Sequence, residues 1–121
     1  MSNVLIVEDD LLIRNLHAVS LRDEGLEVFE ASDAAEALAD FGGREMDLVL
    51  LDIRLENTDV RALLSDLQHR YPRSKTIVCS CHPVDVQKEM IPSAAAYFDK
   101  MDGCSALVSR VRSVLGSSHA S

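Results

Sequence analysis

Short apolar runs alternate along the chain with longer segments whose apolar residues recur every three or four positions. Four large apolar residues in succession, Leu48–Leu51, are too few for a helix and are typical of a parallel strand buried on both faces. This run ends on a carboxylate, Asp52. A similar run, Val4–Val7, lies near the N-terminus, and the alternating residues Glu27–Ala31 indicate a strand at a sheet edge. Two more strands are predicted over Thr76–Cys79 and Ala94–Phe98.

Helical spacing follows each of these strands. The first helix has Asp10 as its expected N-cap and ends at Gly25, and the second begins with a capping box, Asp33 to Glu36, and ends at Gly42-Gly43. Their apolar positions are Leu12, Ile13, Leu16 and Val19 in the first, and Ala34, Ala37, Leu38 and Phe41 in the second.

Three more helices complete the pattern. The third must stop before Pro72, and the fourth, which begins at Pro83 and ends at Pro92, has few apolar positions, so we expect it to be the least stable. Apolar residues with helical spacing are Val60, Leu63, Leu64 and Leu67 in the third helix and Leu107, Val108, Val111, Val114 and Leu115 in the last.

A strand followed by a helix, five times over, predicts an α/β fold with a doubly wound parallel sheet and helices on both faces. We expect the flavodoxin-like strand order 2-1-3-4-5, a three-layer α/β/α arrangement whose ligand crevice lies between the first and third strands. Residues 1–116 are expected to form this one domain, with 117–121 as a disordered tail or the start of a linker.

The composition limits the classes of partner and the location that we expect for the chain. The net charge of −8 argues against direct nucleic-acid binding, which needs a basic face. The apolar runs are too short for a membrane span, and no signal peptide precedes the first strand. Cys79, Cys81 and Cys104 have no zinc-finger spacing, so we expect free thiols and a cytoplasmic location.

Three carboxylates converge on the predicted crevice. Glu8 and Asp9 follow the first strand, and Asp52 ends the third. Like charges about 4 Å apart cost roughly 4 kcal/mol per pair at an effective dielectric of about 20, so a proton or cation is needed to relieve them. Oxygen ligands of this kind suit Mg²⁺. The competing interpretation is that Asp10 caps a helix while Glu8 and Asp9 are solvated surface acids.

Asp52 is either a metal ligand or a nucleophile, because aspartate can accept a phosphoryl group as an acyl phosphate. Such a transfer depends mainly on neutralising the charge of the phosphoryl oxygens. Ser80, at the end of the fourth strand, would supply a hydroxyl, and Lys100, after the fifth, a positive charge. Taken singly, a serine in such a place is more often a cap and a lysine a surface residue.

These segments together resemble the motifs of two-component response-regulator receiver domains over nearly the whole chain. The matching segments are Leu5–Asp10, Leu48–Leu55, Ser80 and Tyr97–Lys100. The resemblance implies that Asp52 is the phosphoacceptor and that Mg²⁺ is held by Glu8 (through water), Asp9, Asp52 and the backbone carbonyl of Arg54. It also implies that Ser80 is the switch hydroxyl, Lys100 its lysine partner and Tyr97 a rotating aromatic, although ordinary packing explains Tyr97 equally well.

The implied role is that of a signalling domain, not an enzyme with a separate substrate, which catalyses its own phosphorylation and dephosphorylation. A histidine kinase or histidine phosphotransfer protein would be the donor. A downstream protein, an output domain or a homodimer partner would receive the signal.

The chain departs from the family at several positions. Glu56 and Val60 stand where receivers usually have Pro and Gly, so we expect a different path for the loop after Asp52. Met101 replaces the usual Pro after the lysine, and Cys81 a smaller residue. Two positions that tune dephosphorylation in the family carry Arg54 and His82 here, from which we expect a long-lived phosphorylated state or a restricted choice of donor.

Three other functions compete with this interpretation. A dehalogenase-type phosphohydrolase would want a second acid where Arg54 stands, and a flavodoxin-like cofactor binder would need a phosphate loop where Glu8, Asp9 and Asp10 repel phosphate. The third is a degenerate receiver that acts, without phosphorylation, as a protein-interaction module.

Overall fold

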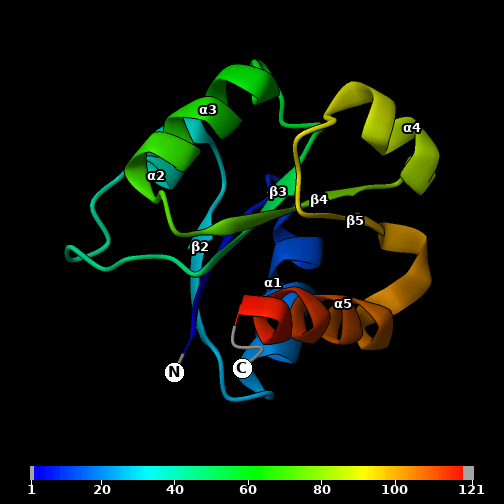
Figure 1. The fold of residues 1–121 in the computed structure, drawn as a ribbon, viewed down its shortest axis with the longest axis horizontal. Helices are drawn as coiled ribbons and strands as arrows, with labels where there is room; N and C mark the ends of the chain where they lie inside the picture. Colours follow the sequence, from blue (N-terminus) through cyan, green and yellow to red (C-terminus); the bar gives the residue numbers. More distant parts are fainter. Residues whose placement is uncertain (1, 119–121) are drawn as a thin grey trace.

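The structure, a computed structural model, describes residues 2–118 as a parallel sheet between two layers of helices (Figure 1). The elements in chain order are β1 (Asn3–Val7), α1 (Leu11–Arg22), β2 (Glu27–Ala31), α2 (Ala34–Ala37), β3 (Leu48–Asp52), α3 (Val60–Arg70), β4 (Lys75–Ser80), α4 (Val84–Met90), β5 (Ala96–Asp99), a 3₁₀ turn η1 (Lys100–Asp102) and α5 (Gly103–Ser118).

The sheet has the order β2-β1-β3-β4-β5 with every neighbouring pair parallel, which confirms the predicted fold. β3 lies at the centre and all five of its residues are buried, as its continuous apolar run predicts. β2 is an edge strand, again as predicted. The crevice where the strand order reverses lies between β1 and β3, at their carboxyl ends.

Alternating side chains of the strands face two separate cores. On one face α1 and α5 cover a cluster that includes Ile6, Leu50 and Phe98. On the other, α2, α3 and α4 cover a cluster that includes Leu5, Leu51 and Val78. Figure 1 shows α1 and α5 together on one side of the sheet and α2, α3 and α4 on the other.

The apolar residues that predict α1 are not the ones that bury it. Leu12 is 68% exposed, and Leu16 and Val19 are about half exposed, whereas His17, Ala18 and Leu21 face the core. The predicted N-cap is correct, since the Asp10 carboxylate accepts a hydrogen bond from the backbone N–H of Ile13. The periodicity therefore predicts the helix correctly while most of its apolar residues lie on the outer face.

The second helix is one turn long, much shorter than the pattern to Phe41 predicts. Its cap is as expected, because Asp33 accepts from the N–H of Glu36. The helix ends at Ala37 since a new turn starts at once: Asp40 accepts from the N–H of Gly43, and Gly42 and Gly43 both have φ of +73°.

At the C-terminus α5 continues to Ser118 and so includes two residues that we assigned to the tail; residues 119–121 lie outside the described part. The predicted free thiols are confirmed for Cys79, Cys81 and Cys104. Among residues 2–118 we find no helix with the length and apolar character that a membrane span requires.

Candidate functional site

Two strand ends bring the predicted acids together. Val7 pairs with Leu51 in the β1–β3 register, so Glu8 and Asp52 follow at neighbouring positions of the crevice. Oxygen atoms of Glu8, Asp9 and Asp52 lie within 4.8 Å of one another. Glu8 and Asp52 are buried, and Asp9 is exposed. The cluster thus has two protected carboxylates and one at its mouth.

Lys100 lies against the two buried carboxylates. Its Nζ is 2.5 Å from Glu8 Oε1 and 3.3 Å from Asp52 Oδ2. Only about a tenth of its side chain is exposed. The lysine after the fifth strand therefore belongs to the acid cluster, as the shared sheet edge predicted.

Burial and neighbouring charges together set the acid–base properties of this cluster. Burial, followed by the hydrogen bond and the charge of Asp52, raises the pKa of Glu8 to about 7 against the opposing effect of Lys100. For Lys100, burial alone would lower the pKa, but the hydrogen bond to Glu8 and the charges of Asp52 and Glu8 outweigh it, so the pKa is raised. The lysine is charged at neutral pH, while Glu8 readily takes up a proton.

Backbone amides of the loop after β3 fix two of the carboxylates. The N–H of Arg54 donates to Asp52 Oδ1 at 2.9 Å, and the N–H of Glu56 donates to Asp9 Oδ2 at 3.2 Å. A proline at position 56 would have no N–H to give. The departure from the family pattern thus adds a hydrogen bond to Asp9.

The loop takes its left-handed residue at Asn57, with φ of +53°, the one non-glycine residue with positive φ among residues 2–118. Asparagine tolerates this conformation better than most residues. Val60 then begins α3 behind the N-cap Asp59. Whether this path differs from that of receiver domains stays a prediction.

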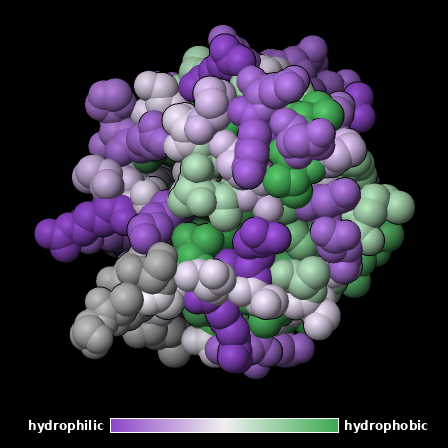
Figure 2. Space-filling model, turned by 45° about the vertical axis from the view of Figure 1, so that its right-hand side comes forward, coloured by the Kyte–Doolittle hydropathy of each residue, from purple (hydrophilic) through white to green (hydrophobic). Residues whose placement is uncertain are grey.

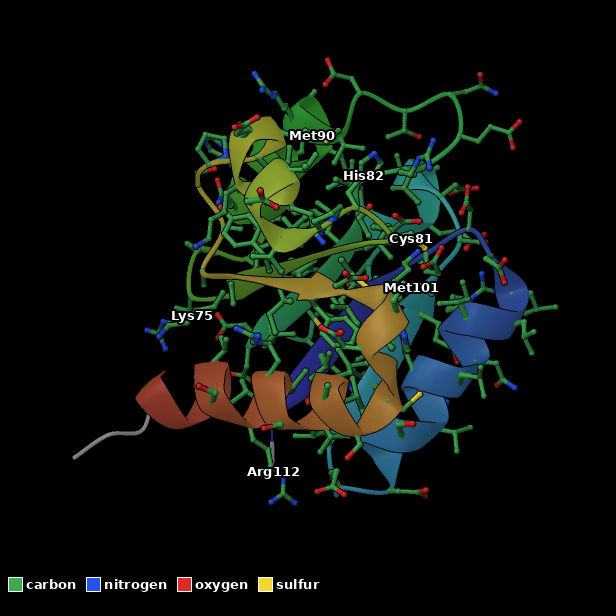
Figure 3. All side chains as sticks on the ribbon, turned by 90° about the vertical axis from the view of Figure 1, so that its right-hand side faces the viewer. Lys75, Cys81, His82, Met90, Met101 and Arg112 are labelled. Atoms are coloured by element: carbon green, nitrogen blue, oxygen red, sulfur yellow. The ribbon has the colours of Figure 1, made fainter. Side chains whose placement is uncertain are left out.

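Ser80 is fully buried at the end of β4, and its hydroxyl is engaged by His82 rather than by the acids. The Ser80 Oγ lies 2.9 Å from His82 Nδ1 and accepts from the N–H of His82 at 3.1 Å. Figure 3 shows His82, Cys81 and Met101 at the same end of the sheet. Ser80 therefore lies at the predicted sheet edge, and its hydroxyl oxygen is held by His82 of the loop that follows β4.

Tyr97 packs into the core beneath α4. Its side chain is buried, and its hydroxyl donates to the carbonyl of Ile91 at 2.6 Å. Lys88 lies over its ring. This is the ordinary packing weighed against the rotating role, and rotation stays a prediction.

Two buried polar residues escaped the sequence analysis. Gln87 of α4 donates to the carbonyls of Ser80, His82 and Phe98, and His17 of α1 lies edge-on to Phe98 with a ring-centre distance of 6.4 Å. Burial lowers the pKa of His17 to about 4, helped by the charge of Lys100. The weak apolar pattern of α4 is a usable signal, because a helix that packs on the sheet with few apolar residues must attach by other means.

The donor set fits Mg²⁺. A hard divalent cation prefers carboxylate oxygens and water, and the cluster offers three carboxylates with one open to solvent. The raised pKa of Glu8 shows the same need for positive charge. The backbone carbonyl of Arg54 as a further ligand stays a prediction.

The rim of the site is unusually apolar. Six large hydrophobic residues are exposed within residues 2–118; four lie on α1 and one, Met101, follows Lys100. Leu11, two residues after Asp9, is 69% exposed, and Met101 is 79% exposed. Figure 2 shows hydrophobic side chains among hydrophilic ones on the face that it presents. Apolar side chains thus start directly beside the charged cluster.

Comparison with known sequences agrees with this site. A family model of the response regulator receiver domain matches residues 4–112. The KDP operon transcriptional regulatory protein KdpE of Escherichia coli is 33% identical over 117 residues, which are 95% of this chain and 52% of KdpE. A putative NtrX-like response regulator of Rickettsia felis is 37% identical over 82 residues, 66% of this chain and 17% of that protein. The chain thus spans about half the length of KdpE and a much smaller part of the NtrX-like protein.

Solved structures show the same fold. A CheY-like receiver domain protein from Methanospirillum hungatei has a TM-score of 0.83 and 27% identity, covering 97% of this chain and 95% of its own. TrrA of Thermotoga maritima, in complex with Mg²⁺-BeF, has a TM-score of 0.80 and 25% identity, covering 94% and 99%. With the acid cluster, its lysine and the strand order in agreement, this chain belongs to the response regulator receiver domains, signalling domains of two-component systems.

Proposed function

We propose that the chain is a phosphoacceptor of a two-component phosphorelay that is phosphorylated on Asp52 in a Mg²⁺-dependent reaction. The observation that carries this proposal is the contact of Lys100 with both Glu8 and Asp52 inside a cluster of three carboxylates. A purely structural ion pair would not need the third, exposed acid. A degenerate receiver would not need to keep so costly a cluster.

Each residue of the cluster has a part in the transfer. An oxygen of Asp52 forms the new bond to phosphorus while the bond from phosphorus to the donor's imidazole nitrogen breaks, and the electron pair stays on that nitrogen. The N–H of Arg54 holds the Asp52 carboxylate in orientation. Lys100 is close enough to exchange its contact with the carboxylate for one with a phosphoryl oxygen.

Glu8, Asp9, Asp52 and the Arg54 carbonyl would hold Mg²⁺, which when bound supplies positive charge to the phosphoryl oxygens. Glu8 would bind it through water, because its carboxylate is already held by Lys100 and by the N–H of Asp10. Asp9, at the mouth, is the acid most open to an incoming cation.

Phosphorylation adds roughly −1.5 to −2 charges to a buried site. Ser80 would release His82 and turn its hydroxyl toward the phosphoryl group, and Tyr97 would repack with α4 and β5 between two arrangements. The signal would pass to a downstream protein, to an output domain or to a second copy of the chain.

The protein donor, a histidine kinase or histidine phosphotransfer protein, would lie over α1. A donor histidine must reach Asp52, so the donor's surface must cover the adjoining rim. That rim carries the exposed apolar residues Leu11, Leu12, Leu16 and Met101. Exposed apolar patches of this kind usually mark interaction sites.

Phosphorylation by acetyl phosphate with Mg²⁺, followed by intact-mass spectrometry, tests the proposal. Wild type should gain one phosphoryl group, and Asp52→Ala none. Asp40→Asn is the matched control, because Asp40 accepts a hydrogen bond from the N–H of Gly43 in the turn after α2 and asparagine can accept it as well; it should label like wild type. No incorporation into wild type, with acetyl phosphate or with a kinase, would favour the degenerate receiver.

The lifetime of the phosphorylated state is a second measurable property. Arg54 exposes its side chain beside Asp52, and the ring of His82 lies at the Ser80 hydroxyl, so both can hold an anion at the site. We expect Arg54→Asn and His82→Glu to shorten the lifetime severalfold when decay is followed after removal of the donor. Lifetimes equal to that of wild type would contradict this expectation.

A further inference from the structure

Helix α4 is attached to the sheet by an amide group. It is seven residues long, its N-cap Pro83 makes no side-chain hydrogen bond, and its one buried residue is Gln87, which is 0% exposed. Helices α1, α2 and α3 bury apolar side chains, as α3 does with Val60 and Leu67. Val84 also packs partly against the core and Lys88 lies over the Tyr97 ring, but Gln87 is the most deeply buried attachment of α4.

The hydrogen-bond partners of Gln87 belong to β4, to the loop that follows it, and to β5. Gln87 Nε2 donates to the carbonyl of His82 at 2.8 Å and of Phe98 at 2.9 Å, with a longer contact of 3.4 Å to the carbonyl of Ser80. Phe98 precedes Lys100 by two residues. One carboxamide thus ties α4 to the backbone next to both proposed phosphoryl contacts, Ser80 and Lys100.

The other half of the carboxamide is unsatisfied. Gln87 Oε1 is the one buried side-chain nitrogen or oxygen without a hydrogen-bond partner in the part of the chain that the structure describes. A buried acceptor without a donor costs free energy in this arrangement, and an arrangement that supplied a donor would recover it. A different packing of α4 that gave Oε1 a donor would therefore recover this free energy.

A donor becomes free when the serine turns. The backbone N–H of His82 now donates to Ser80 Oγ, and the His82 ring holds the same oxygen. If the hydroxyl moves toward Asp52, this N–H loses its acceptor, while the carbonyl of the same residue is already bound to Gln87. When Ser80 Oγ moves away, the N–H of His82 can thus become a hydrogen-bond donor for Gln87 Oε1.

We propose that Gln87 is a positioning residue that latches α4 in the packing in which His82 holds the Ser80 hydroxyl, and that the latch opens when Asp52 is phosphorylated. This proposal rests on the proposed function. It assigns the restraint on the switch to a side chain that touches neither the acids nor the phosphoryl group. When the latch opens, Nε2 gives up its hydrogen bonds to three carbonyls and Oε1 gains one donor, so removing the amide should favour the phosphorylated packing.

The test measures binding of Mg²⁺ and beryllofluoride, a phosphoryl mimic, by amide NMR signals of residues 52–60. Q87M keeps the size of the side chain and removes its hydrogen bonds, and it should bind beryllofluoride about three- to tenfold more tightly than wild type. The affinity for Mg²⁺ alone should not change, since Gln87 does not contact the cluster. Q87N, with a shorter amide, should show a smaller gain and guards against misfolding of Q87M.

The matched control is Q68M, which makes the same change at an exposed position of α3 and should bind like wild type. Equal or weaker beryllofluoride binding by both Q87M and Q87N, with wild type binding normally, would overturn the latch alone. Failure of wild type itself to bind would refute the proposed function and the latch with it. A merely structural role would lower thermal stability without changing the affinity for beryllofluoride.

Discussion

Helices α1 and α3 both have apolar residues at helical spacing, but the apolar side of α3 faces the sheet and that of α1 faces outward. In α3 the four residues that define the pattern, Val60, Leu63, Leu64 and Leu67, are all buried against the sheet. In α1 the corresponding leucines and valine face outward, and the core side consists of His17, Ala18 and Leu21. Periodicity reports that a helix has an apolar side; it does not report what covers that side.

The difference follows from what each helix must fill. α3 covers the centre of the sheet, where long aliphatic side chains reach the core cluster around Leu51 and Val78. α1 lies next to α5 and the first two strands, and small Ala18 with the flat ring of His17 fits there against Phe98. Its outer apolar side is therefore not required by the fold and is available for a partner.

Truncating one leucine in each helix should give the largest contrast. Leu67 is 1% exposed, so Leu67→Ala should lower the free energy of unfolding by about 3 kcal/mol, through lost burial and the cavity left behind. Leu16→Ala in α1 should change it by no more than about 0.5 kcal/mol. Urea denaturation monitored by circular dichroism measures both. Equal losses would mean that the outer side of α1 is packed in solution.

The buried side of α1 should make stability sensitive to acid. The pKa of His17 falls from an ordinary 6.5 to about 4 on burial, so the unfolded chain binds the proton more tightly than the folded one. Stability from this residue is complete above pH 6.5 and is lost as the pH falls toward 4. The loss should be about 1 to 2 kcal/mol once partial access of water to the ring is allowed for.

Urea denaturation at pH 7.5 and pH 5 measures this effect in wild type and in His17→Gln. The variant should lose less stability over that interval, because glutamine does not titrate. Other groups, among them Glu8 with its raised pKa, contribute to both proteins and cancel in the comparison. The same loss in both proteins would show that His17 is hydrated in the folded state. His69→Gln, at an exposed position of α3, is the matched control, and its free energy of unfolding should fall between the two pH values as much as that of wild type.

The sheet and the acid cluster could be predicted from the sequence, because they depend on the order of strands and helices and on the residues at the strand ends. Runs such as Leu48–Leu51 indicate buried parallel strands, and parallel strands bring Glu8, Asp52 and Lys100 to one edge whatever their side chains do. Which side of α1 faces the core could not be predicted from the spacing of its apolar residues, because the sheet or a partner protein can cover an apolar side equally well. The hydrogen bonds of Gln87 and of Ser80 with His82 depend on rotamers and on a fold already formed.

The outer side of α1 should affect transfer from a protein donor and no other step. Leu12→Ser removes an exposed apolar side chain of the rim, so transfer from a phosphorylated histidine kinase should slow by about tenfold, equivalent to roughly 1.4 kcal/mol of docking free energy. Labelling by acetyl phosphate should be unchanged, because this small donor needs only the cluster. Met90→Ser, at an exposed position of α4, is the matched control and should leave both rates as in wild type. A kinase that phosphorylates Leu12→Ser at the wild-type rate would mean that this side of α1, unlike that of α3, faces water both in the free chain and in the complex.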